Sequence, residues 1–121
     1  PDNFTAPRLE SPANTIRSRG EDQLDLTDIR NSLRSLMWRN VGISRNEHDL
    51  VTARQQLDFW ANYVCRRDLV DPPGWELQNM MLVARSMAAA ALERRESRGV
   101  HARSDYPQTL ESQRTHICIR N

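Results

Sequence analysis

The sequence contains no lysine. All 17 of its basic residues are arginines, and they face 16 acidic residues, so the formal net charge is only +1. An arginine-rich surface is typical of nucleic-acid binding, but interleaved carboxylates cancel the positive field that such binding requires. We therefore expect no nucleic-acid partner. A bias in composition explains the choice of arginine, which also forms better forked pairs with carboxylates than lysine does.

Cysteine and hydrophobic residues are limited as well. The two cysteines, Cys65 and Cys118, lie too far apart for metal-ligand spacing, and the helical pattern around Cys65 predicts a small buried thiol. Hydrophobic residues make up 38% of the 121 residues, which allows one modest core. The sequence shows no signal-peptide pattern and no apolar run of membrane-spanning length, so we expect a cytoplasmic protein with reduced thiols.

The residue patterns of catalytic and cofactor-binding sites are also missing. The sequence has no glycine-rich phosphate loop, no paired cysteines and no serine nucleophile elbow. Its three histidines, His48, His101 and His116, are scattered, which is typical of surface or helix-capping residues, and His48 should be solvated. We therefore predict no catalytic, cofactor-binding or metal-ligating residue in this chain.

The first 25 residues have the composition of a linker. Pro1, Pro7 and Pro12 interrupt this segment, and its apolar residues follow no period. The absence of an initiator methionine before Pro1 agrees with a piece cut from a longer chain. We interpret residues 1–25 as a linker from a missing upstream domain.

Two amphipathic patterns follow the linker and predict helices. The first covers 28–41, with Thr27 as a fair N-cap and Gly42 as the residue that stops the helix. The second covers 47–67 and has Asn46 as its N-cap. Apolar residues recur along both at steps of three and four, which predicts one buried face on each helix.

A third helical pattern begins after the sequence Asp71-Pro72-Pro73-Gly74, which breaks the second. It covers about 75–98 and ends at Gly99, a suitable C-cap. Short loops between three amphipathic helices predict an all-α fold, an antiparallel three-helix bundle of the spectrin-repeat type over residues 26–107. The tail, 108–121, has no strong period, and its "HICI" sequence could form a short strand or a packed extended segment.

Bulky side chains are distributed evenly over the three predicted helices. Each helix has one tryptophan, as inter-helix anchors would require. The methionines of the third helix recur at helical spacing, which favours core positions over a binding groove. These residues are Trp38, Trp60, Trp75, Met80, Met81 and Met87.

The stretch "RRESRGVHARSDYP", residues 94–107, is unusually rich in polar side chains for a helix end. One interpretation is a helix C-terminus followed by a solvated turn. The other is a polar surface that fits a partner. Composition alone favours the first and stops at a helical domain of unknown function.

The residues of this stretch resemble a known family. "ESRGVHARSDYP" at 96–107, after a helix that begins "WELQNMMLVA", resembles the C-terminal helical domain of the succinate dehydrogenase/fumarate reductase flavoproteins. The segment "LMWRNVGISR" at 36–45, "ELQN" at 76–79 and Asp-Tyr-Pro at 105–107 are similar to the L-aspartate oxidase branch of that family. The resemblance covers roughly 26–107 and does not extend into the linker or the tail.

The resemblance implies a function for the whole polypeptide rather than for this chain. Oxidases of that branch convert L-aspartate to iminoaspartate on FAD, oxygen or fumarate reoxidises the flavin, and quinolinate synthase takes the product toward NAD. The FAD-binding and catalytic residues of the family lie upstream, so none is assigned here. What transfers is an interdomain docking role against the FAD domain of the same polypeptide, for Glu96, Ser97, Arg98, His101, Arg103 and Asp105.

A second interpretation belongs to a different class of protein. The chain could be a free-standing three-helix module that binds other proteins through an exposed helix face. The two interpretations differ in what precedes the chain, because only the oxidase requires an upstream Gly-x-Gly-x-x-Gly fingerprint in the same reading frame.

Overall fold

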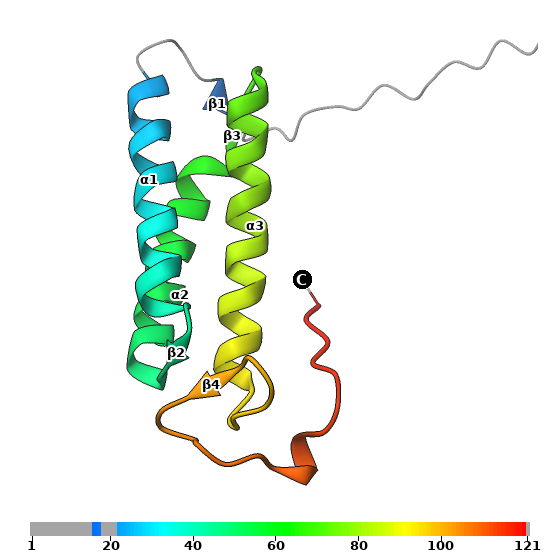
Figure 1. Ribbon diagram of the computed structural model, residues 1–121. Helices are drawn as coiled ribbons and strands as arrows, with labels where there is room; N and C mark the ends of the chain where they lie inside the picture. The colour runs from blue at the N-terminus through cyan, green and yellow to red at the C-terminus, as the bar shows by residue number, and fades with distance from the viewer. Residues whose placement is uncertain (1–15, 18–21, 121) are drawn as a thin grey trace, which may run out of the picture.

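Three helices form a bundle in the computed structural model of the chain, which describes residues 16–17 and 22–120. The helices are α1 (Asp22–Asn40), α2 (Glu47–Val64) and α3 (Pro72–Glu93). Helices α1 and α3 run in the same direction, and α2 runs antiparallel to both (Figure 1). The predicted all-α class and the predicted bundle of three helices are confirmed.

The apolar stripes that predict the helices also form the core. Every helix contributes residues at three- and four-residue steps, as one buried face requires. Leu50, Ala53, Leu57 and Val64 of α2 are completely buried, so the middle helix is the centre of the packing. The rest of the core consists of Leu26, Leu33, Leu36, Val41, Ala61, Leu69, Leu77, Met81, Ala84, Ala88 and Ala91.

Helix α1 begins at Asp22, so the prediction of Thr27 as its N-cap is wrong. Leu26 is buried, which continues the apolar stripe of α1 by one helical step, three residues upstream of Ile29. Burial of that extra turn outweighs the modest preference of threonine for a cap position. The helix ends at Asn40, close to the predicted stop at Gly42. A Cβ atom at position 42 would lie 2.2 Å from the carbonyl oxygen of Trp38, so the turn requires glycine.

Helix α3 begins at Pro72, three residues earlier than predicted. Asp71 is the N-cap, and its carboxylate accepts a hydrogen bond of 3.2 Å from the Gly74 amide. Proline suits the first turn of a helix, where its missing N–H would have no helical acceptor. The sequence that ends the second helical pattern therefore also starts the third helix.

Short extended segments connect the helices at both ends of the bundle. Of the predicted linker, Ile16–Arg17 forms β1, which pairs in parallel with β3 (Arg67–Asp68), and α2 ends at Val64 before this pair rather than at residue 67. At the opposite end, β2 (Ser44–Arg45) pairs in parallel with β4 (Ala102–Arg103). The linker residues 1–15 and 18–21 lie outside the described residues.

Several predictions about bulky side chains are wrong. Trp38 is 74% exposed and Trp75 is 52% exposed, although the Trp75 indole N–H donates to the Leu69 carbonyl. Only Trp60 packs against the core, at its margin. Leucines of all three helices and alanines of α2 and α3 form the core, and they leave the tryptophans at its margin or on the surface. Met87 is half-exposed, and Cys65 is exposed because it follows the last turn of α2.

Over the described residues 108–120, the tail contains one turn of 3-10 helix, Glu111–Gln113, and no strand. Of the "HICI" sequence, Ile117 is half-buried at the end of α3, and the neighbouring residues are exposed. Within residues 16–17 and 22–120, none of the helices combines the length and the apolar character needed to cross a membrane.

The central position of α2 leads to a stability prediction. Leu57→Ala should lower the free energy of unfolding by about 2–5 kcal/mol, because Leu57 is completely buried and its removal leaves a cavity. Phe59→Ala, a change on the same helix at a side chain that is 70% exposed, should change it by less than about 0.5 kcal/mol. Urea unfolding of the two variants measures both values, and equal losses would contradict the packing described here.

Candidate functional site

The polar stretch after α3 turns back on itself in a two-residue hairpin. Arg98 and His101 exchange backbone hydrogen bonds of 2.8 and 3.0 Å, and Gly99 has a positive φ of 57°. Glycine at the first central position is typical of a type II′ turn. The prediction of Gly99 as the C-cap of the third helix is therefore wrong, since α3 already ends at Glu93.

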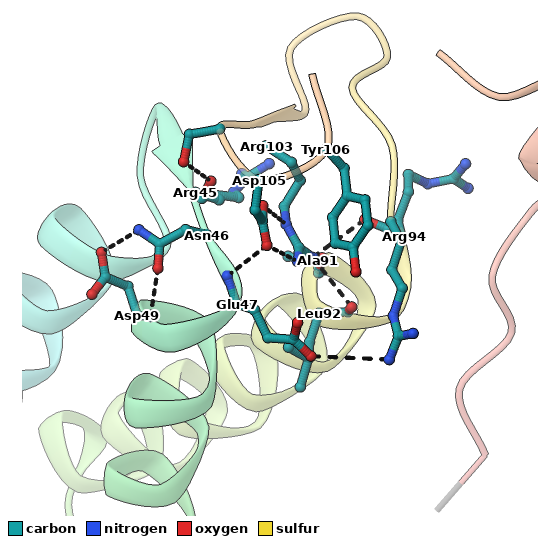
Figure 2. Close-up of polar contacts among 12 residues, drawn as sticks. Arg45, Asn46, Glu47, Asp49, Ala91, Leu92, Arg94, Arg103, Asp105 and Tyr106 are labelled. Atoms are coloured by element: carbon teal, nitrogen blue, oxygen red, sulfur yellow. Dashed lines mark hydrogen bonds and ion pairs between the residues drawn. The ribbon is translucent and has the colours of Figure 1, made fainter. Parts of the chain in front are cut away.

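The side chain of Arg103, rather than a glycine, caps the C-terminus of α3. The hairpin brings Arg103 back beneath the helix end, where its Nη1 donates to the carbonyl oxygens of Ala91 and Leu92 at 2.9 and 3.2 Å (Figure 2). These carbonyls are among the last four of the helix, which receive no hydrogen bond from an N–H within it. Arg103 is only 1% exposed, so a buried cation lies at the negative end of the helix dipole.

Asp105 balances that buried charge and connects it to another helix. Its two oxygens accept hydrogen bonds from the other two nitrogens of the Arg103 guanidinium, Nε at 2.8 Å and Nη2 at 2.7 Å. Its Oδ2 also accepts the backbone N–H of Glu47, the first residue of α2, at 3.0 Å (Figure 2). The hydrogen bonds from Arg103, followed by that from Glu47, lower the pKa of Asp105 to about 2. One ion pair thus joins the end of α3 to the start of α2.

Glu96 is the centre of a second ionic cluster. Its carboxylate is completely buried and accepts hydrogen bonds from Arg94 at 2.7 Å, from Arg98 at 3.0 and 3.2 Å, and from the Leu110 amide at 2.8 Å. Burial alone would raise the pKa of Glu96. The bonds from Arg98 above all, then those from Leu110 and Arg94, lower it to about 2, so the group stays ionised at neutral pH.

The same arginines attach the tail to the bundle. Arg94 donates to the carbonyl oxygens of Gln113 and Thr115 at 2.8 and 2.7 Å, and Arg98 donates to that of Leu110 at 3.0 Å. Sequence reasoning missed these contacts because the acceptors in the tail are backbone carbonyls. Every residue type has such a carbonyl, so the side chains of the tail do not indicate the contact.

Ser97 closes the hairpin on its inner side. Its hydroxyl accepts the Arg103 amide at 2.9 Å and lies 2.8 Å from the carbonyl oxygen of Tyr106, to which it donates. The Arg103 guanidinium lies 5.0 Å above the Tyr106 ring, close enough for a cation–π contact. The serine therefore holds the backbone that positions Arg103.

The hydrogen bonds of His101 define its tautomer. Nε2 lies 3.0 Å from the carbonyl oxygen of Arg94, which can only accept, so Nε2 carries the proton. Nδ1 then accepts from Arg45 Nη1 at 2.8 Å. Burial lowers the pKa of His101, and the positive charges of the neighbouring arginines lower it further by a smaller amount. The imidazole is therefore neutral at neutral pH. The predicted capping role of a histidine is found here, whereas His48 is solvated as predicted.

The structure brings all six predicted motif residues together at one end of the bundle. Their charged groups bond mainly to one another and to backbone within the chain. Sequence reasoning missed Arg45, Glu47 and Arg94, of which the first two belong to a distant loop and helix start. Docking of the six residues against another domain concerns a contact outside this chain and stays a prediction.

The chemistry of this end of the bundle is structural. Both carboxylates are held ionised by arginines, and the histidine uses both ring nitrogens. Among the described residues, no group of three or more histidine, cysteine, aspartate or glutamate side chains could hold a metal ion. The arrangement can hold backbone segments in place, and it presents no nucleophile activated by a base.

Comparison with known proteins identifies relatives of this chain. The sequence pattern of the fumarate reductase flavoprotein C-terminal family matches residues 30–119. The chain is 36% identical over 101 residues to an uncharacterized FAD-dependent oxidoreductase of Methanocaldococcus jannaschii, covering 80% of this chain and 19% of the relative. It is 38% identical over 95 residues to the L-aspartate oxidase of Pseudomonas aeruginosa, covering 72% of this chain and 17% of the relative.

A solved structure has the same arrangement of helices. The chain is similar to Mycobacterium smegmatis Sdh1, solved in complex with UQ1, with a TM-score of 0.59 and 34% sequence identity. The match covers 69% of this chain and 15% of Sdh1. The chain thus spans less than a fifth of the length of each of these relatives.

The buried ion pair leads to a prediction about stability. Arg103→Ala should lower the free energy of unfolding by about 3–5 kcal/mol, because it removes the cation that balances the Asp105 carboxylate and the side-chain donor of the helix-end carbonyls. Arg114→Ala removes another arginine–carboxylate pair, with Glu111, in which both side chains are at least 75% exposed. That change should cost no more than about 1 kcal/mol. Chemical denaturation compares the two, and similar small losses would contradict a role for Arg103 in joining the helices.

The tautomer of His101 leads to a prediction about pH. The folded chain disfavours protonation of His101, so the unfolded chain binds the proton more readily as the pH falls below about 6.5. Stability should therefore be higher at pH 7.5 than at pH 5.5. His101→Gln preserves a donor and an acceptor without titrating, so it should flatten the slope in this window. Melting curves at the two pH values measure the difference, and an unchanged slope would assign the effect to another group.

Proposed function

The chain belongs to the fumarate reductase flavoprotein C-terminal family, and we propose that it is the C-terminal helical domain of an FAD-dependent L-aspartate oxidase. In this proposal the whole polypeptide oxidises L-aspartate to iminoaspartate, an early step toward NAD. The relative from Pseudomonas aeruginosa supports the choice of branch. So do the Trp38 to Ile43 segment, which forms the last turn of α1 and the loop after it, and the Asp-Tyr-Pro sequence at 105–107.

The chain itself does not fit as the holder of FAD. Its four glycines, at positions 20, 42, 74 and 99, are too far apart to form a dinucleotide-binding loop. The arginines best suited to a pyrophosphate, Arg94, Arg98 and Arg103, bond to carboxylates and carbonyls of the chain. FAD, which would accept the electrons from L-aspartate, therefore belongs to an upstream domain in this proposal, and no catalytic step is assigned to these residues.

The role proposed for the domain is to support that upstream part. In this assignment the connection lies within residues 1–25, although Ile16–Arg17 pairs with β3 and α1 already begins at Asp22. Residues 26–107 form the rest of the helical domain, and 108–121 form its tail. The observation that supports it best is the closed network at the end of the bundle. Two carboxylates and three arginines bond within the chain, which stabilises a shape and leaves no reactive group. A free-standing binding module would need no such match to a flavoprotein family.

Expression of the complete reading frame that contains this chain tests the proposal. The product should be yellow, should bind FAD and should release hydrogen peroxide when L-aspartate and oxygen are supplied. The 121-residue chain alone should bind no FAD, because the loop for it lies upstream. Absorbance spectra, calorimetry with FAD and a peroxide assay give the three measurements.

Two results would contradict the proposal. A complete frame without an upstream Gly-x-Gly-x-x-Gly fingerprint after a strand would favour the free-standing module. A flavoprotein that oxidises another substrate but leaves L-aspartate unchanged would keep the family and refute the oxidase.

A further inference from the structure

The three grooves between the helices of the bundle differ in what covers them. The groove between α1 and α2 is lined mainly by polar side chains, including Asn31, Ser35 and Gln56. The groove between α2 and α3 is partly covered by the tail, through Ile119 and Arg120. The first is suited to water and the second is occupied by the chain itself, so neither requires a partner.

The groove between α1 and α3 is apolar and open. It has a volume of about 550 Å³, and α2 lies behind it in the view of Figure 1. Trp38 is 74% exposed at its edge, and Val83 and Met87 are 57% and 48% exposed along α3. A continuous set of exposed tryptophan, methionine and valine side chains is typical of a surface that another protein segment covers.

The spacing of the groove residues indicates the shape of the occupant. Met80, Val83, Ala84 and Met87 lie on α3 at steps of three, four and seven, and Met37 faces them from α1. Helices α1 and α3 are parallel, so the groove is straight and has the form that accepts the apolar face of a further helix. Methionine side chains adapt their shape to such a partner.

One charge at the rim indicates the chemistry of the occupant. Arg34 lines the groove and makes no ion pair with another residue between 22 and 120. The other charged residue of the rim, Glu76, already accepts from Arg30 at 2.9 Å. A carboxylate on the occupant would therefore find in Arg34 a partner with no ion pair among the described residues, which would fix its register in the groove.

We propose that the α1–α3 groove is the surface on which an apolar helix of the upstream, FAD-binding part of the same polypeptide docks, with a carboxylate opposite Arg34. This rests on the proposed function. The chain matches only 15–19% of the length of its relatives, so in such a protein most of the polypeptide is tethered to this domain. A tether raises the effective concentration of the docking segment, and a groove of this modest size then suffices.

Hydroxyl-radical footprinting compares the 121-residue chain with the product of the complete reading frame. Tryptophan and methionine are reactive probes, and Trp38 and Met87 lie on the two sides of the groove. In the longer polypeptide their oxidation should fall about fivefold or more, since the centre of an interface excludes water. Phe59 lies on α2 outside the groove, is 70% exposed and should react equally in both.

A matched pair of substitutions tests the groove directly. Val83→Glu in the longer polypeptide places a charged carboxylate where the apolar face of the occupant would lie, and it should restore the oxidation of Trp38 to the level of the isolated chain. Ser35→Glu adds the same charge in the polar α1–α2 groove and should leave the protection of Trp38 unchanged. Both positions are exposed, so both variants should fold.

The outcomes separate this proposal from the proposed function. If the longer polypeptide turns over L-aspartate but Trp38 and Met87 react as in the isolated chain, the groove proposal is overturned alone. If both are protected but the polypeptide binds no FAD, the oxidase proposal is wrong, and what stands of the groove proposal is the docking of an upstream segment that binds no flavin. Protection that appears in the isolated chain with rising concentration would identify a second copy as the occupant and overturn it.

Discussion

The contact on which the end of the bundle depends is the one between Arg103 and the last carbonyls of α3. A buried guanidinium is unfavourable unless all its donors are satisfied and its charge is balanced. The helix end supplies oxygens and the negative end of its dipole, and Asp105 supplies the balancing charge. To reach this position the chain must reverse direction within a few residues of α3. That requirement explains the positive φ of Gly99 and the inward hydroxyl of Ser97, since both hold the reversal that delivers Arg103.

Two carboxylates, Asp105 and Glu96, hold different parts of this end of the molecule together. Asp105 connects α3 to α2 through the Glu47 amide, so it acts between helices. Glu96 gathers Arg94 and Arg98, whose remaining donors bind carbonyls of the tail, so it acts between the bundle and residues 110–115. Because arginines lower the pKa of both carboxylates to about 2, neither connection is lost near neutral pH. His101, whose pKa is lowered mainly by burial, contacts the Arg45 loop as well as the end of α3.

The sequence predicts the helices better than their ends, for a physical reason. Burial of one helix face leaves a local period, so the stripes of all three helices, with Leu57 at the centre, can be predicted. The end of α3 depends on Arg103, which lies 12 residues beyond the Ala91 carbonyl that it caps, and no local rule describes such a cap. The same limit applies to the site. Its residue types can be recognised, but the pairing of Glu96 with Arg98 and of Asp105 with Arg103 follows only once the hairpin is known. The tryptophans fail for a different reason, because leucines and alanines form the core and leave Trp38 and Trp75 exposed.

The density of polar residues in a recognisable sequence does not by itself indicate a contact surface. In this chain both carboxylates and three of the four guanidinium groups at 94–107 bond to partners within the chain whose loss is costly, and only Arg95 is mainly exposed. Such a network restricts the residue types at several positions together, which is enough to make the sequence distinctive. The α1–α3 groove, which is open to a partner, has an ordinary helical sequence, in which Met80, Val83 and Met87 follow the period of α3. It can be recognised only from the structure, because exposure distinguishes a docking face from a core face when both follow the same period.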